Sequence, residues 1–423
     1  MKKITVAIAG LGSREKNTYA KDLLKMTDKA QLVAVAEPDP EKRQMVVDSH
    51  GIDPKYAFET VEELLRQPKL ADALLLCTQD AMHIRQAIPA LEKGYDLLLE
   101  KPISSDKEEC NRLHAVAEAC GRKVAVCHVL RFAPIYQKVK QVLDSGVLGQ
   151  LQSIQSLENV AYWHQAHSFV RGNWRTTREA APMIMAKSCH DMDLMVWLTG
   201  RKCRAVSSFG SLGHFKPECA PEGAAKRCMD GCKAKETCPY DAEKIYLTGK
   251  DTGFLAGHTG WPCNILTNYP SEESLRKAIQ EGPYGRCVYF CDNDVVDHQV
   301  VNLEMEGGVT VNFTMTAFTA ETGRYTKYMG THGSMIADMD RNLITVTPFG
   351  QESTVYDVSR ESKTSGHGGG DTRLLEAFID YAAGGSPENI TSLADSLESH
   401  YICMAAEASR LAGGQVMEVA NFR

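Results

Sequence analysis

Several apolar segments of the first 130 residues end in polar side chains whose chemistry suits a cofactor site. In "YDLLLEKPIS", residues 95–104, three leucines are followed at once by Glu100, Lys101 and Pro102. A surface turn would explain one such ending, because lysine and glutamate are readily solvated. Other segments end in the same way, however, with polar residues that we predict to contact a cofactor: Thr78, Gln79, the nearby His83, and His128. A cation at the end of such a segment would stabilise negative charge that develops on a bound oxygen.

A second set of reactive residues lies between positions 162 and 187. It mixes aromatic, imidazole and cationic side chains: Tyr162, Trp163, His164, His167, Arg171, Arg175 and Lys187. For any single arginine, a solvated basic loop is the simpler interpretation. The mixture favours a sugar site, because aromatic rings stack on sugar faces and fixed guanidinium groups bind anionic oxygens. The chain carries a net charge of −7, so a local cluster would be needed to hold an anionic substrate.

The elements that must position these residues begin with a strand, a glycine turn, a helix and a second strand. "ITVAIA", residues 4–9, leads into "GLGSRE", where we expect the cofactor pyrophosphate to contact Gly10, Gly12, Ser13 and Arg14. Glu15 occupies the third glycine position of the usual fingerprint, so the motif is informative mainly through its place between strand and helix. Glu37, at the end of the second strand, would accept hydrogen bonds from the adenosine ribose and repel a 2′-phosphate. The sequence therefore predicts NAD rather than NADP.

Strands and helices alternate up to about residue 128, and the pattern then changes. Alternation predicts a parallel sheet with ligands beyond the carboxyl ends of its strands. A linking helix follows, and later segments such as "VVNLEMEGGVTVNFTMTAF" read as antiparallel hairpins, this one closed by Gly307 and Gly308. We predict an α/β Rossmann domain over residues 1–128 and an α+β domain over residues 129–423. The second domain should hold an open, mainly antiparallel sheet, interrupted by a cysteine-rich insertion at about 215–290.

The strand that ends in Glu-Lys-Pro, together with the glycine turn, resembles the Gfo/Idh/MocA oxidoreductases over nearly the whole chain. The resemblance implies an NAD-dependent enzyme in which Lys101 touches both the nicotinamide ribose and the substrate hydroxyl. It also implies a homodimer or homotetramer built on the open sheet. Trp174 and Arg175 match a pair that lies near the cofactor in the family.

His190 begins a helix that aligns with the family segment crossing the active site. A histidine there usually caps or packs, but the resemblance gives it a catalytic role. The family's usual acid, four residues earlier, is Ala186 in this chain, and Lys187 follows. Simple alcohol oxidation by His190 alone is therefore in question. We predict catalytic roles for Lys101, His190, Lys187 and Tyr162.

Further polar residues are candidates for substrate contacts. In "SGHGGGDTRLLEAF" a glycine-rich loop carries His367 and Asp371 into a helix, where Asp371 would also serve as a cap. Similar loops reach toward the substrate in carbohydrate-active members of the family. The full set predicted to bind substrate is His164, His167, Arg171, Lys187, His190, Asp191, His367 and Asp371.

The insertion contains Cys219, Cys228, Cys232 and Cys238, and "YGRCVYFCDND" adds Cys287 and Cys291. A structural zinc site is one interpretation, with Cys228, Cys232, Cys238 and Cys287 as ligands. The spacings are looser than paired C-x2-C motifs, so an iron–sulfur cluster and free buried thiols stay open.

We expect a cytoplasmic enzyme acting on a small-molecule sugar or glycoside. No apolar run is long enough to span a bilayer, and the acidic charge gives no reason to expect nucleic acid as a partner. The preferred hypothesis is a redox-neutral glycosidase, similar to a sulfoquinovosidase, which transiently oxidises C3 of an anionic glycoside with tightly bound NAD. The alternatives are an NAD-dependent sugar or polyol dehydrogenase and a non-catalytic dinucleotide sensor, which the presence of Lys101 disfavours.

Overall fold

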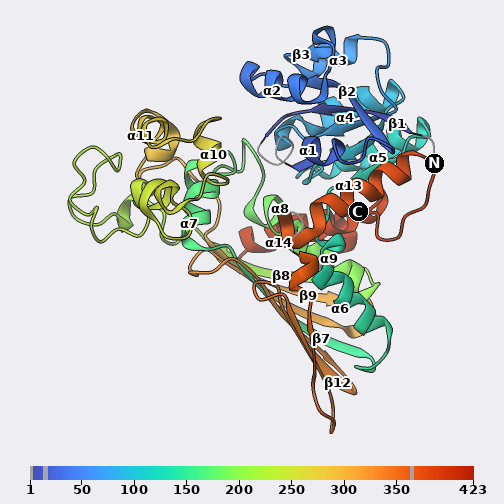
Figure 1. Ribbon diagram of the computed structural model, residues 1–423. Helices are drawn as coiled ribbons and strands as arrows, with labels where there is room; N and C mark the ends of the chain where they lie inside the picture. The colour runs from blue at the N-terminus through green and yellow to red at the C-terminus, as the bar shows by residue number, and fades with distance from the viewer. Residues whose placement is uncertain (1–2, 13–17, 363–365) are drawn as a thin grey trace.

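The amino-terminal domain, up to about residue 128, is a parallel sheet with helices around it. The computed structural model of the protein describes residues 3–12, 18–362 and 366–423 (Figure 1). Six parallel strands lie in the order β3-β2-β1-β4-β5-β6. The strands are β1 (Ile4–Ala9), β2 (Ala30–Ala36), β3 (Ala57–Phe58), β4 (Ala73–Leu76), β5 (Asp96–Leu99) and β6 (Val124–Val126). The helices between them are α1 (Ala20–Leu23), α2 (Pro40–His50), α3 (Val61–Arg66), α4 (His83–Glu92) and α5 (Lys107–Ala119).

The apolar runs of the sequence are the buried centre of this sheet. Every residue of β4, and the three leucines of β5, are fully buried, as expected when helices cover both faces. The strand order reverses between β1 and β4, which is where ligands bind in sheets of this kind. The Rossmann-type domain predicted from the sequence is confirmed.

The second domain, which is the rest of the chain, holds a nine-stranded sheet in the order β14-β13-β12-β11-β7-β10-β9-β8-β15. Within this sheet, β7 and β10 are the one parallel pair among the described strands, so the predicted mainly antiparallel sheet is confirmed. The β9–β10 hairpin turns through Gly307 and Gly308, both at positive φ, as predicted. The strands are β7 (Leu151–Asn159), β8 (Cys203–Ser211), β9 (His298–Met305), β10 (Thr310–Thr316), β11 (Gly323–Gly330), β12 (Gly333–Asp338), β13 (Leu343–Pro348), β14 (Thr354–Asp357) and β15 (Met417–Glu418).

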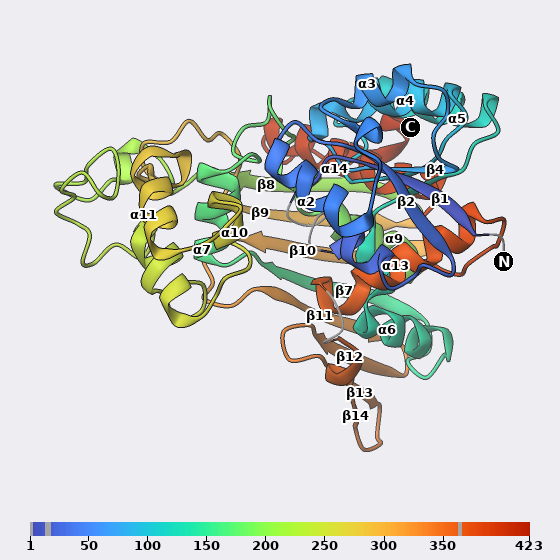
Figure 2. The same ribbon diagram turned by 45° about the horizontal axis from the view of Figure 1, so that its top comes forward.

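Helices of the second domain cover the face of its sheet that is turned toward the Rossmann domain (Figures 1 and 2). They are α6 (Pro134–Asp144), α8 (Met183–Ala186), α9 (Cys189–Thr199), α13 (Gly366–Ala382) and α14 (Leu393–Leu411). The segment entering α14 hydrogen-bonds the edge strand β6 through Thr391, and His400 within α14 accepts the backbone N–H of Ile103 at 2.9 Å. These hydrogen bonds join the two domains close to the loop that carries Lys101.

An insertion separates β8 from β9 and has its own core of tyrosines, cysteines and aliphatic residues. It includes α10 (Cys263–Leu266) and α11 (Glu272–Glu281) and lies at one end of the nine-stranded sheet, beside α2 (Figure 1). Asn268, just after α10, donates its amide to Asp39 (3.2 Å) and Glu41 (3.0 Å) on the Rossmann domain. The insertion therefore contacts the Rossmann domain just after β2, near Glu37, where the adenosine ribose is predicted to bind. No described helix is long and apolar enough to cross a membrane.

Candidate active site

The glycine turn after β1 is held by Glu37. Gly10 has a φ of +85°, and a Cβ at this position would lie 2.4 Å from the carbonyl oxygen of Cys77, so only glycine fits. The Glu37 carboxylate accepts the backbone N–H of Leu11 at 2.6 Å and that of Asp39 at 3.0 Å. A tight turn facing a carboxylate at the end of β2 is the arrangement that holds the pyrophosphate and the adenosine ribose of NAD. Gly12 follows in the same turn, and Ser13 and Arg14 lie outside the described residues.

His83 connects the loops that follow β4 and β5. His83 is fully buried, with Nδ1 2.7 Å from the carbonyl oxygen of Pro102 and Nε2 3.1 Å from that of Thr78. The Thr78 hydroxyl donates to Gln86 at 2.7 Å, while Gln79 is exposed. The structure therefore gives His83 a positioning contact, because it fixes the two loops from which the cofactor contacts are expected.

Lys101 reaches from the Rossmann domain to the second domain. Its ammonium donates to the backbone carbonyl of Ala186 at 2.6 Å, at the end of α8. Glu100, beside it, is buried and accepts from the Tyr19 hydroxyl at 3.2 Å. Asp80 is a site residue that the sequence did not reveal: the Trp174 side chain hydrogen-bonds it, and burial raises its pKa against the opposing charges of His83 and Lys101.

His190 lies near Lys101, and the described part of the protein leaves both of its ring nitrogens without a hydrogen-bond partner. Its side chain is 5% exposed, and neither ring nitrogen has a hydrogen-bond partner within the part of the chain that the structure describes. Burial, with Lys101 and His128 nearby, holds the pKa of its imidazole well below the usual value. His128, whose ring centre is 5.8 Å from that of His190, hydrogen-bonds Ser396 at 2.7 Å and is likewise kept neutral by burial. A buried polar ring without partners at an active-site position is suited to contact a substrate.

A buried charge network supports the start of α9. Asp191 accepts two hydrogen bonds from Arg324 of β11, at 2.6 and 3.0 Å. Arg324 also pairs with Glu158 at 2.9 Å, and Lys187 reaches the same carboxylate at 3.0 Å. Glu158 and Arg324 were not predicted, because their strands read as ordinary sheet and only the pairing of β7 with β11 brings them together. Asp191, predicted to bind substrate, is committed to Arg324 and is fully buried.

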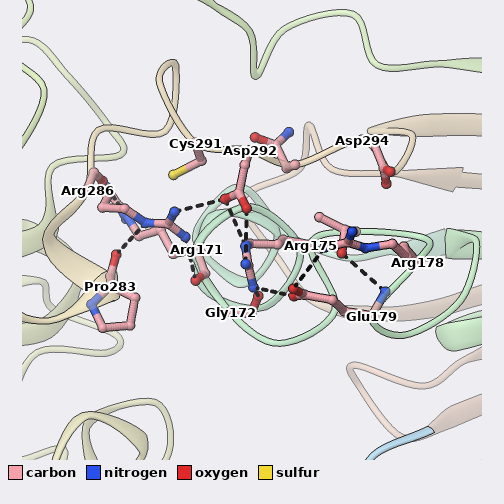
Figure 3. Close-up of polar contacts among 12 residues, drawn as sticks. Arg171, Gly172, Arg175, Arg178, Glu179, Pro283, Arg286, Cys291, Asp292 and Asp294 are labelled. Atoms are coloured by element: carbon pink, nitrogen blue, oxygen red, sulfur yellow. Dashed lines mark hydrogen bonds and ion pairs between the residues drawn. The ribbon is translucent and has the colours of Figure 1, made fainter. Parts of the chain in front are cut away.

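Arg175 and Trp174 lie in the segment that connects the site to the insertion. Asp292 binds Arg175 in a bidentate contact (2.9 and 3.0 Å) and also accepts from Arg286 at 2.8 Å (Figure 3). Hydrogen bonds from Arg175, and then from Arg286, hold the pKa of Asp292 well below its usual value. In this structure Arg175 therefore anchors the insertion, and its predicted contact with NAD stays a prediction.

The structure separates the residues predicted between 162 and 171. His164 is packed among Trp163, Phe169 and Trp261 and lies within electrostatic range of Lys187. His167 is buried, stacked on Tyr284 and bonded to the Tyr246 hydroxyl at 3.0 Å. Half-buried Tyr162 faces the insertion, with its ring 6.2 Å from that of Tyr240. His164 is thus the member of this set that lies near Lys187, the residue after Ala186, whose carbonyl oxygen binds Lys101.

The Arg171 side chain points into the insertion, which supplies its hydrogen-bond partners among the described residues. It is fully buried and donates to the carbonyl oxygens of Arg286 and Tyr240, each at 2.7 Å. Its third partner is the Cys228 sulfur at 3.5 Å. A guanidinium used in this way holds protein backbone, so the prediction that Arg171 contacts a sugar has no support in this geometry.

The four cysteines predicted to bind zinc line one small cavity of about 10 Å³, together with Arg171. The structure does not confirm the metal, because no three His, Cys, Asp or Glu side chains among the described residues are arranged to hold one. Burial raises the pKa of the thiols of Cys228, Cys238 and Cys287. In this arrangement the four cysteines are free thiols, and Cys228 and Cys287 belong to the core of the insertion.

The glycine-rich loop brings a histidine and a carboxylate together at the edge of the site. Nδ1 of His367 lies 3.1 Å from each carboxylate oxygen of Asp371. The His367 ring centre is 6.2 Å from that of His190. His367 and Asp371, both predicted to bind substrate, thus contact each other, and the ring of His367 lies near that of His190.

These observations define a dinucleotide-binding enzyme with a lysine and several neutral imidazoles beyond the switch point of a parallel sheet. Residues 4–128 match the GFO_IDH_MocA family domain described as "Oxidoreductase family, NAD-binding Rossmann fold", and residues 140–417 match its C-terminal alpha/beta domain. The chain belongs to this family of oxidoreductases and carries its NAD-binding domain.

Individual relatives are more distant. The chain is 23% identical over 399 residues to the putative oxidoreductase YteT of Bacillus subtilis, covering 88% of this chain and 87% of that protein. It is 24% identical over 210 residues to 2,7-anhydro-N-acetylneuraminate hydratase of Mediterraneibacter gnavus, or 50% of this chain and 53% of that one. Among solved structures it resembles the WlbA dehydrogenase of Bordetella pertussis in complex with NADH and UDP-GlcNAcA. The TM-score is 0.67 and the identity 17%, over 99% of each chain.

Glu37 offers a test of cofactor choice. We expect NAD to bind more tightly than NADP, because a buried carboxylate at this position repels a 2′-phosphate. Glu37→Gln keeps an acceptor for the Leu11 N–H but removes the charge. The ratio of the NADP and NAD dissociation constants should therefore fall by roughly 10-fold or more, because a hydrogen bond to a charged group contributes about that much. Titration calorimetry with both dinucleotides measures the effect. Equal affinities in the unmodified protein would contradict the assignment.

The buried histidines predict sensitivity to acid. Burial lowers the pKa of His167 and of His400 to about 3. Between about pH 6.5 and 3 the unfolded chain binds protons at these positions and the folded protein does not. The free energy of unfolding should therefore fall as the pH decreases through this window, by about 1.4 kcal/mol per pH unit for each histidine. His167→Phe should make the pH dependence of urea unfolding shallower, whereas His332→Phe, at an exposed position, should not.

Proposed function

We propose that the protein is a redox-neutral glycosidase that acts on an anionic sugar glycoside by transient oxidation at C3. The proposal depends on one observation about His190, which lies near both Lys101 and the His367–Asp371 pair. Its ring nitrogens have no hydrogen-bond partner among the described residues. Oxidation of an alcohol needs one group to accept the hydroxyl proton. This site offers several imidazoles and two ammonium groups, which suits a reaction with repeated proton transfers.

Bound NAD would accept a hydride from C3 and return it at the end of the cycle. Side chains of the protein would stabilise charge and transfer protons in the other steps. Lys101 donates a hydrogen bond to the C3 oxygen and stabilises negative charge on it in both directions. The ketone at C3 acidifies the C2 proton, a neutral imidazole removes that proton, and the C1–O bond breaks with its electron pair on the aglycone oxygen, which is protonated. Water then adds at C1 as a proton returns to C2.

Positive charge at the site supports an anionic head group. Lys187 is about one-fifth exposed, and its ammonium pairs with Glu158, which also pairs with Arg324. Two of the similar proteins bear names that refer to acidic sugars, a neuraminate derivative and UDP-GlcNAcA. We therefore propose a uronic or sulfonated sugar glycoside as the substrate class.

The test uses the purified protein with stoichiometric NAD and a panel of aryl glycosides of uronic acids and 6-sulfosugars. We expect many turnovers without net NADH, and in heavy water a product with deuterium at C2. An NAD-dependent sugar or polyol dehydrogenase, the second candidate, would accumulate NADH in equal amount to product and leave C2 undeuterated. Steady NADH formation from a free sugar would overturn the glycosidase proposal.

For the insertion we propose a structural zinc ion held by Cys228, Cys232, Cys238 and Cys287. Support comes from the single cavity that they line and from Arg171, a buried cation whose charge would offset the thiolates that metal binding creates. The sulfurs would have to draw together around the ion.

Metal analysis should then give about one zinc per chain, as expected for a closed four-thiolate site. Cys232→Ser should lower the melting temperature with NAD affinity largely unchanged, while Cys120→Ser, in the Rossmann domain, serves as the matched control. A metal-free preparation in which Cys232→Ser melts like the parent would exclude the site. The dimer or tetramer expected on the open face of the sheet also stays a prediction, which sedimentation would measure.

A further inference from the structure

We propose that residues 261–268 of the insertion close over the NAD site and keep the dinucleotide bound from one turnover to the next. This segment contacts both domains, one at each of its ends. The inference rests on the NAD-binding domain that the chain shares with its family, and it holds for a net oxidation and for a redox-neutral hydrolysis alike. Its test measures the release of the cofactor without substrate, so the result is independent of the proposed glycosidase reaction.

One end of the segment binds the Rossmann domain directly after β2. The Asn268 amide donates to Asp39 at 3.2 Å and to Glu41 at 3.0 Å. Asp39 is the N-cap of α2, and its backbone N–H donates to the Glu37 carboxylate at 3.0 Å. Asn268 therefore holds the first turn of α2 from the insertion, two hydrogen bonds away from the carboxylate that is predicted to bind the adenosine ribose.

The other end of the segment packs on the second domain near Lys187. The ring centre of Trp261 lies 5.0 Å from that of Trp163 and 4.8 Å from that of His164. Aromatic rings at such separations attract one another. His164 is within electrostatic range of Lys187, which follows the residue whose carbonyl oxygen binds Lys101. Trp261 therefore joins the insertion to the end of the site at which the nicotinamide and the substrate are expected.

The middle of the segment is the short helix α10, which is fixed to the core of the insertion. Cys263, its first residue, is fully buried, and its thiol donates to the backbone carbonyl oxygens of Tyr246 and Thr252, each at 3.4 Å. In both views of the molecule α10 lies between α7 (Tyr162–His164) and α2 (Figures 1 and 2). The segment thus crosses from one domain to the other and is held at both ends and in between.

This connection has a kinetic consequence for a ligand at the edge of the parallel sheet. A dinucleotide bound from Glu37 to Lys101 can leave only after the segment has separated from one of the two domains. A segment that must open for a ligand to exit slows its release, and the same opening limits its entry. The contacts of Asn268 and Trp261 therefore set the dissociation rate of NAD, and one bound NAD serves successive turnovers.

The test follows the release of NADH from the full-length protein. The protein is loaded with NADH and mixed with excess NAD, and the fluorescence of the bound nicotinamide reports dissociation. Asn268→Ala removes two hydrogen bonds to carboxylates without changing the charge of the site, so release should be about 10-fold faster or more. Trp261→Ala removes the ring contacts at the other end and should speed release by about fivefold or more. In both variants the association rate should equal or exceed that of the parent.

Two further variants separate an opened segment from other effects. Tyr269→Ala, at an exposed position next to Asn268 and outside both contacts, is the matched control and should release NADH at the parent rate. Glu41→Ala weakens the Asn268 contact from the Rossmann side at an exposed position, so it should speed release by about threefold. Loss of a negative charge near a pyrophosphate would by itself slow release, so the sign of this effect is diagnostic.

Several results would overturn the proposal. One is release within about twofold of the parent rate in Asn268→Ala, because the segment would then not hinder exit. Another is faster release in Asn268→Ala with an unchanged rate in Trp261→Ala, which would limit Asn268 to supporting Glu37 through Asp39. A lower association rate in both variants would indicate a damaged NAD site, and slower release in Glu41→Ala would indicate a purely electrostatic effect.

Discussion

Lys101→Ala should abolish turnover while leaving the protein folded. The ammonium reaches across the domain boundary to the carbonyl oxygen of Ala186 and lies within range of His190, His128 and Asp80. A cation in a largely buried site stabilises charge on the reacting oxygen far better than water does. Removing one such donor costs about 100- to 1000-fold in kcat. We therefore expect both hydride transfer and glycoside hydrolysis to fall by at least that factor.

Lys123 provides a matched control for this variant. It too donates to a backbone carbonyl of the second domain, that of Tyr381, but it stands at the amino end of β6, away from the ligand edge. Lys123→Ala should remove a similar contact and leave kcat within about threefold. Turnover and NAD binding are measured for both proteins. If Lys101→Ala kept more than a tenth of the parent kcat, the lysine would have no catalytic role.

Arg324→Met should be the most destabilising substitution of the site region. Arg324 is the partner of two fully buried carboxylates, Asp191 and Glu158, and Lys187 contacts only the second. Without the guanidinium, Asp191 is left as an uncompensated buried charge. Breaking a buried pair in this way costs about 3–5 kcal/mol of unfolding free energy. Urea unfolding of the variant measures the loss.

The control for Arg324 is an arginine–carboxylate pair at the surface. Arg204 pairs with Glu304 on β9 with about half of each side chain exposed. Arg204→Met should cost at most about 1 kcal/mol, because exposed pairs contribute little. Asp191→Asn in the Arg324→Met background should recover part of the lost stability, since it removes the unpaired charge. A loss below about 1 kcal/mol in Arg324→Met would show that the network does not hold the start of α9.

Much of the cofactor edge follows from short segments of sequence. The strand β5 is apolar because helices bury both faces of a parallel sheet, and Lys101 stands at its end because strands of such a sheet all end at the same edge. Gly10 and Glu37 are likewise set by local rules: a turn too tight for a Cβ, and a carboxylate one strand away. Leu11 and Glu37 are 26 residues apart, but each stands directly after a strand that its apolar sequence reveals, so periodicity and residue type are sufficient to predict them.

Tertiary structure decided which polar residues face the substrate and which face the protein. Arg171, His167 and Asp191 have side chains as suitable for binding a sugar as those of His190 or Lys187. Their partners, however, are Tyr240, Tyr246 and Arg324, which lie 69, 79 and 133 residues away in the chain. His367 and Asp371, by contrast, are only four residues apart in the sequence. Their distance from His190 is nevertheless set by tertiary structure, because α13 packs on the segment after β6. Contacts of this kind depend on the register of β7 with β11 and on the docking of the insertion. The sequence by itself determined the sheet, its ligand edge and the lysine on it, whereas the long-range pairing of buried charges determined which of the candidate groups remain available for chemistry.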